Sequence, residues 1–210
     1  MPSRKQYVRE RYLPCRKAKI DHKFYNTKTT TNFYHNKLSS LLPHVHFTFN
    51  DFDLEYDENK DKKNRINIPC DSNLHNMQIL KKDHNHIIMT ILYDWTDGNQ
   101  HMSMLIADTI NKRIEWFDTY NTYKYIYEPI KKKIQRYFPK YHIVKVHQRI
   151  IQEDDDDHYC QSWPYYYMYK RLYKKKTMKS IVGKLMEKDK KRRIDVIRNF
   201  HYKISKNIMK

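Results

Sequence analysis

The sequence predicts an α+β domain in which a small, mainly antiparallel sheet is flanked by helices. Between residues 86 and 148, short runs rich in Ile, Leu, Val and aromatic residues are bounded by turn residues, which is typical of neighbouring strands. After residue 160 the apolar residues recur at helical spacing instead. A length of 210 residues suits one domain, or one domain with an extension.

The expected strands follow one another along the middle of the chain. "RINIP" (65–69) is a candidate short strand, and the nearly continuous apolar run His86–Trp95 predicts a buried central strand. A hairpin is expected next, from His101–Asp108 to Arg113–Tyr120, with "TINK" as its turn. "YHIVKVHQ" (141–148) alternates in polarity and predicts a fourth strand.

Helices are expected before and after this last strand. "YKYIYEPIKKKIQRYF" (123–138) has apolar residues at helical spacing, and we expect Pro129 in its first turn, where a missing N–H costs little. The run after Cys160 places Trp163, Tyr167, Met168 and Leu172 on one stripe. "SIVGKLMEK" (180–188) and "IDVIRNFHYKI" (194–204) predict two more amphipathic helices with basic outer faces.

Residues 1–64 have a different texture from residues 65–210. They are polar, charged and rich in turn residues, with short apolar patches but no long period. We therefore expect an irregular basic N-terminal extension over 1–64 and a folded domain over 65–210.

The charge balance indicates acidic partners. Lys and Arg number 42 and Asp and Glu 24, which gives a net charge of +18 and a sequence pI near 9.6. Such a surface attracts nucleic acid, and Tyr alternates with Lys in 120–137 and 165–176, as it does where bases stack on protein. Two plainer explanations stay open: a Lys-, Asn-, Ile- and Tyr-rich composition from an AT-rich genome, and amphipathic helices with buried Tyr and solvated Lys.

The cysteines and the hydropathy indicate an intracellular, reducing compartment. Cys15, Cys70 and Cys160 are odd in number and widely spaced, unlike a disulfide framework or a zinc pattern. No apolar run approaches the roughly 18 residues of a membrane span, and the N-terminus has no signal-peptide core, so no membrane partner is expected. "HNH" (His84 and His86) lies beside Asp83 without further ligands nearby, so we predict no metal site.

Cys160 is the candidate nucleophile. It lies at the expected start of a helix, where unpaired N–H groups and the helix dipole favour a thiolate. Just before it stand five acids, 153–157, whose charge would oppose a thiolate unless they point into solvent. The alternative is a buried structural cysteine.

His101 and Asp118 are the candidate base and its orienting partner. With a two-residue or a four-residue loop in the hairpin, both side chains share one face of the sheet, about 5–8 Å apart at Cβ. A three-residue loop would separate them. Gln152, eight residues before Cys160, is the candidate oxyanion donor, with Gln148 and Gln161 as rivals.

The order His, Asp, Gln, Cys resembles that of the SUMO-specific (Ulp1-like) proteases and the adenovirus maturation protease. "HMSMLIADTINKRIEWFDTY" and "HYCQSWPYYYMYKRL" carry this resemblance, the second being similar to uncharacterised members of the clan from large DNA viruses. The resemblance covers about residues 85–172. It implies a papain-like, Ulp1/adenain-type fold, and a cysteine protease with His101, Asp118, Gln152 and Cys160 as catalytic residues.

The same resemblance implies a substrate and a setting. The substrate would be a ubiquitin-like tail or a viral precursor polyprotein, cleaved at a peptide or isopeptide bond after a Gly-containing site. No cofactor is expected, except that a polyanion such as DNA is a candidate activator, and a viral protein would work in host cytoplasm or virion. Met102, Tyr159 and Gln161 stand where the family often has Trp, Asp and Gly. These departures leave open a catalytically inactive relative that acts as a basic binding module.

Overall fold

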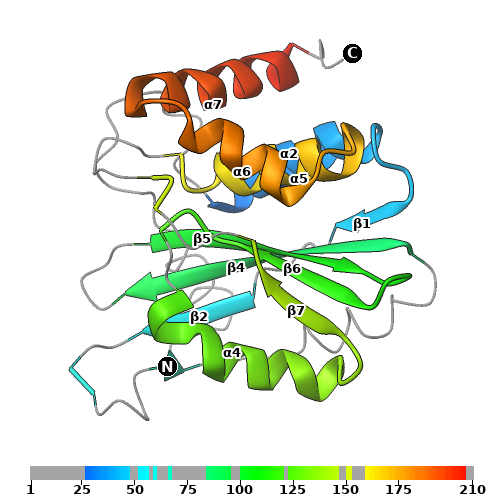
Figure 1. The fold of residues 1–210 in the computed structure, drawn as a ribbon, viewed down its shortest axis with the longest axis vertical. Helices are drawn as coiled ribbons and strands as arrows, with labels where there is room; N and C mark the ends of the chain where they lie inside the picture. The colour runs from blue at the N-terminus through cyan, green and yellow to red at the C-terminus, as the bar shows by residue number, and fades with distance from the viewer. Residues whose placement is uncertain are drawn as a thin grey trace, which may run out of the picture.

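The computed structural model describes residues 27–47, 52–56, 59–60, 66–67, 84–95, 100–120, 123–146, 150–152 and 159–206. In chain order its elements are α2 (Thr27–Ser39), β1 (Val45–Phe47), β2 (Phe52–Tyr56), β3 (Ile66–Asn67), β4 (His86–Trp95), β5 (Gln100–Asp108), β6 (Arg113–Phe117), α4 (Tyr123–Tyr137), β7 (His142–Lys145), α5 (Ser162–Met168), the π-helix η2 (Tyr169–Tyr173), α6 (Met178–Met186) and α7 (Lys190–Ser205). One sheet lies between α4 on one face and α2, α5 and α6 on the other, with α7 outermost (Figure 1).

The α+β class is confirmed, but the sheet is mixed, not mainly antiparallel. Its strand order is β3-β2-β4-β5-β6-β7, and β1 also pairs with β4. The hairpin strands β4, β5 and β6 pair antiparallel, as does β2 with β3. β1 and β2 both run parallel to β4, and β7 runs parallel to β6. Parallel pairing requires crossover connections, which local sequence patterns do not reveal.

The central elements begin and end close to their predicted positions. β4 has the predicted bounds, because its Ile, Leu and Tyr side chains are buried on both faces of the sheet. The hairpin turn is the four-residue TINK loop, since Asp108 and Arg113 form the last pair. Pro129 was predicted in the first turn of its helix, and this was wrong. The helix begins at Tyr123, so Pro129 lies in its interior.

The expected boundary at residue 64 does not coincide with an edge of the fold. Residues 27–39 form a helix, and Tyr34 and Leu38 are fully buried in the core. β1 and β2 add to the exposed edge of β4. These parts of the expected extension therefore belong to the α+β fold. Their weak local periodicity hid this, because their packing and strand pairing depend on partners far along the chain.

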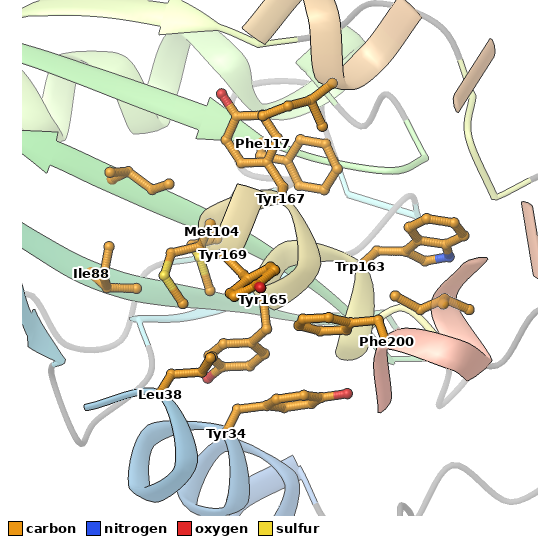
Figure 2. Close-up of a cluster of buried hydrophobic side chains, with 14 of the residues drawn as sticks. Tyr34, Leu38, Ile88, Met104, Phe117, Trp163, Tyr165, Tyr167, Tyr169 and Phe200 are labelled. Atoms are coloured by element: carbon orange, nitrogen blue, oxygen red, sulfur yellow. The ribbon is translucent and has the colours of Figure 1, made fainter. Parts of the chain in front are cut away.

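Two apolar layers lie on the two faces of the sheet. On one face, Ile130, Ile134 and Phe138 of the α4 segment cover alternate residues of the strands. On the other face, the helices build a layer rich in aromatic rings (Figure 2). There the ring of Tyr34 stacks on Tyr165 with centroids 4.5 Å apart. Aromatic rings thus supply much of the buried area in a chain of modest apolar content.

None of the helices in the described ranges is both long and apolar enough to span a bilayer.

Candidate active site

The β5–β6 hairpin brings His101 and Asp118 together. Met104 pairs with Phe117. His101 lies three residues before Met104, and Asp118 directly follows Phe117, so both lie at this end of the hairpin. His101 Nε2 lies 3.2 Å from Asp118 Oδ1, and both side chains are 0% exposed. The predicted imidazole–carboxylate hydrogen bond is therefore present, in the register of the four-residue loop. A buried charge-assisted bond of this kind holds Nε2 at a defined position beside the carboxylate.

Further contacts hold this pair from three sides. The backbone N–H of Tyr120 donates to Asp118 Oδ1 over 2.8 Å. The ring of Tyr120 meets the imidazole edge-on, with centroids 4.8 Å apart, and the ring of Tyr93 stacks against its face. Because Nε2 faces Asp118, the buried Nδ1 is the ring nitrogen that would face a nucleophile.

Gln152 lies next to this pair through Thr119. The Thr119 hydroxyl donates to Gln152 Oε1 over 3.0 Å, and the Thr119 carbonyl accepts from the Gln152 backbone N–H at 3.3 Å. With the amide oxygen held by Thr119, the donor end of the amide is directed away from Thr119. Gln152 is 2% exposed. Of its rivals, Gln161 is the N-cap residue of α5, and Gln148 lies outside the described residues.

Cys160 lies in the turn that leads into α5. The Tyr159 carbonyl accepts from the N–H groups of Ser162 and Trp163, so the turn is continuous with the helix. Cys160 is 6% exposed. The expectation of a cysteine at a helix start is confirmed.

The direction of α5 places Cys160 at the same end of the sheet as His101. Met178, beyond η2, contacts Arg113 at the start of β6. Arg171 contacts Glu115, and the ring of Tyr167 stacks on Phe117 with centroids 4.4 Å apart. The path from Met178 back to Tyr167 therefore runs along β6 from Arg113 to Phe117, so the helices and the strand are antiparallel.

Continued to the start of α5, this path leads toward the residues after Phe117. That segment contains Asp118 and Thr119, which bind His101 and Gln152. These hydrogen bonds therefore gather His101, Asp118 and Gln152, and the first turn of the helix that follows Cys160 lies at the same end of the sheet.

A buried carboxylate clamps the helices to β6. Glu115, 3% exposed, accepts from the Tyr167 hydroxyl at 2.7 Å and from Arg171 at 2.9 Å, while Arg113 lies 3.5 Å away. The hydrogen bonds to Glu115 raise the pKa of Arg171. Burial, and then the Glu115 charge, raise the pKa of Tyr167. The sequence does not reveal this clamp, because nothing near Glu115 in the chain indicates its distant partners.

Other predicted features contribute less to the site. Cys15, Cys70, Asp83 and the acids 153–157 lie outside the described residues. Within the described ranges, no group of three or more His, Cys, Asp or Glu side chains is arranged to hold a metal ion. Thr119 was not among the predicted site residues, although its position directly after Asp118 was a usable signal.

Several solved structures have a fold similar to that of this chain. No family model and no curated protein matches the sequence. ChlaDub1 of Chlamydia trachomatis has a similar structure, with a TM-score of 0.56 and 12% identity over 83% of this chain and 89% of that chain. The C. trachomatis effector Cdu1, solved bound to ubiquitin, has a TM-score of 0.54 and 14% identity, covering 94% of this chain and 95% of that chain. An effector of Chlamydia abortus, ChlaDUB, has a TM-score of 0.54 and 10% identity, covering 86% of this chain and 91% of that chain.

At these low identities the likeness is one of fold. The chain shares the α+β fold of ChlaDub1 and Cdu1.

Proposed function

We propose that the protein is a cysteine peptidase of the Ulp1/adenain type that cleaves after a Gly-containing tail of a ubiquitin-like protein. The observation that carries the proposal is the buried His101–Asp118 bond, joined through Thr119 to Gln152. The fold shared with Cdu1, which was solved bound to ubiquitin, supports the substrate class. A viral precursor polyprotein is the second substrate class to test, and both classes fit an intracellular setting.

The proposed reaction assigns one role to each residue. His101 takes the thiol proton of Cys160, and the thiolate attacks the scissile carbonyl carbon. The Gln152 amide N–H donates to the oxyanion that forms. The intermediate collapses to a thioester as the imidazolium gives its proton to the leaving amine. His101 then takes a proton from water, which attacks the thioester and releases the acid and the thiol. Asp118 keeps the imidazole oriented throughout.

Covalent capture tests the nucleophile. Ubiquitin and SUMO that carry a C-terminal propargylamide should form a one-to-one adduct with the wild-type protein. The Cys160→Ala variant should form none, while a Cys15→Ala/Cys70→Ala variant should react normally. An adduct in Cys160→Ala, or equal labelling of all three cysteines by iodoacetamide, would contradict the proposal.

Gln152 offers a test of a single step. An oxyanion donor acts when a carbonyl is attacked, and it has no part in alkylation of a thiol. Gln152→Ala should slow hydrolysis of ubiquitin aminomethylcoumarin by about 100-fold and leave the alkylation rate of Cys160 with iodoacetamide unchanged. A fall in both rates would show that Gln152 holds the site together instead.

We propose as a second candidate function that the helical face binds single-stranded nucleic acid. Residues 159–206 contain 15 Lys and Arg but three acids. Burial, and then the charges of Lys174, Lys203, Lys184 and Lys176, lower the pKa of Lys170. Lys174 Nζ lies 4.9 Å from the ring centroid of Tyr173, which stacks on Tyr169. Such a combination of cations and rings suits both phosphates and bases.

Salt dependence and charge reversal test this function. A fluorescent poly-dT oligonucleotide should bind with an affinity that falls steeply as salt rises. Changing Lys174, Lys184 and Lys203 to Glu should abolish binding. Changing Lys131, Lys132 and Lys133 of α4 to Glu, on the other face of the sheet, should weaken oligonucleotide binding far less. Equal losses would show that net charge alone attracts the oligonucleotide.

A further inference from the structure

A tyrosine on the central strand lies flat against the candidate base. Tyr93 in β4 pairs directly with His101 in β5. Their rings stack with centroids 5.5 Å apart and planes 12° from parallel. Directly paired residues of antiparallel strands share one face of the sheet, so the backbone itself sets this contact. Both side chains are buried.

The hydroxyl of Tyr93 is anchored beneath the site. It lies 2.6 Å from the Ser103 hydroxyl oxygen, which also accepts the Trp116 Nε1–H over 2.9 Å. Ser103 is two residues after His101, on the same face of β5. All three side chains are buried. The ring of Tyr93 cannot shift without leaving buried polar groups unsatisfied, which makes its position firm.

The imidazole is thus bounded by groups of different kinds. Asp118 binds Nε2 of the imidazole. The ring of Tyr120 meets the imidazole with an angle of 78° between the two planes, and the ring of Tyr93 covers one face of the imidazole. Asp118 fixes where Nε2 lies, but a single hydrogen bond leaves the ring able to tilt about it. A flat neighbour on the face restrains that tilt.

We propose that Tyr93 is a positioning residue for His101, and this inference rests on the proposed peptidase function. Its anchored ring holds the imidazole plane so that Nδ1 faces Cys160. When Nδ1 takes the thiol proton, the positive charge on the imidazole lies against the electron-rich face of Tyr93. Tyr93 contacts neither the substrate nor the reacting sulfur in this role, and it acts through His101.

Alkylation of Cys160 by iodoacetamide measures this role without any substrate. The rate is followed by mass spectrometry of the Cys160 peptide in the full-length protein, at a temperature where every variant is folded. Tyr93→Phe keeps the ring and should react within about twofold of wild type. Tyr93→Leu removes the ring and should react about tenfold more slowly, equivalent to ~1.4 kcal/mol.

A matched core variant separates positioning from general loosening. Leu105→Ala removes a fully buried side chain from β5, the strand of His101, on the same face of the sheet as Tyr93 but further from His101. It should lower the melting temperature at least as much as Tyr93→Leu, yet leave the alkylation rate of the folded protein unchanged.

Three outcomes would overturn the inference: Tyr93→Leu reacting like wild type, Tyr93→Phe slowing as much as Tyr93→Leu, or Leu105→Ala slowing the reaction equally. Failure of the proposed function looks different. In that case His101→Ala would not slow alkylation of Cys160 at all, and the inference would fall with it.

Discussion

Two buried carboxylates lie three residues apart, Glu115 within β6 and Asp118 directly after it, and they have different kinds of partner. Glu115 faces the helices, where it binds two guanidinium groups and a phenol. Asp118 binds an imidazole and a backbone N–H. Arginine stays charged at all physiological pH values, whereas histidine changes its charge near neutrality.

This difference separates a structural clamp from a site suited to proton transfer. The guanidinium groups around Glu115 stay charged at physiological pH, and these contacts fasten α5 and η2 to the sheet. The partner of Asp118 is an imidazole, the type of side chain that general acid–base catalysis uses most often, which is why the proposed function places its base here. The comparison teaches that the partner of a buried carboxylate, more than its burial, indicates what it does.

Asp118→Asn should have the largest effect, on reactivity. The amide no longer balances a protonated imidazole, so iodoacetamide should alkylate Cys160 about 100-fold more slowly at pH 6.5, equivalent to ~2.7 kcal/mol. Urea unfolding should change little by comparison. The control is Asp108→Asn at the other end of the hairpin, which should react at the wild-type rate. An unchanged rate in Asp118→Asn would remove its orienting role.

Glu115→Gln should act on stability instead. It leaves two partly buried guanidinium groups without their carboxylate, and the free energy of unfolding should fall by about 2 kcal/mol, below the range for fully buried pairs because both arginines are one-third exposed. Urea unfolding measures this. Glu128→Gln breaks an exposed pair with Lys131 and should cost less than ~0.5 kcal/mol. Equal costs would show that Glu115 is no clamp.

A third buried polar pair sharpens the contrast through pH. His35 Nε2 contacts the Tyr165 hydroxyl, and burial, then the nearby His46, lower the pKa of His35 to about 4. Between pH 6.5 and 4 the unfolded chain therefore binds a proton that the folded protein does not. Stability should fall with decreasing pH across this window, by up to ~1.4 kcal/mol per unit.

Urea unfolding at pH 7 and pH 5 checks this dependence. His35→Gln should flatten it, whereas the exposed His44→Gln should not. An unchanged slope in His35→Gln would assign the acid sensitivity to other groups.

Tyr167→Phe should have the smallest effect. It removes one hydrogen bond to Glu115 but keeps the ring stacked on Phe117, so the free energy of unfolding should fall by about 1 kcal/mol. Calorimetry of the two proteins measures the difference. A loss as large as that of Glu115→Gln would mean that the phenol, and not the arginines, carries the clamp.

The sequence predicted what depends on near neighbours. The bounds of β4 follow from one apolar run, and the His101–Asp118 contact follows from alternation across a hairpin with an even-numbered loop. Cys160 at a helix start follows from a local pattern of aromatic residues.

The remaining features depend on distant partners. β1 and β2 pair with β4 across long connections, and α2 packs on α5 and α7 from the other end of the chain. In the sequence, Tyr93 is one more apolar residue of a predicted strand, because only the strand register shows that it lies against His101.

The sequence alone thus determined the α+β class and the order of the candidate residues, since side-chain periodicity and hairpin geometry act over a few residues. The tertiary structure decided the mixed sheet, the membership of residues 27–47 and 52–56 in the fold, the Glu115 clamp and the surroundings of His101. These rest on contacts between segments far apart in the chain, and such contacts are chosen by the packing of the whole fold, not by any local pattern.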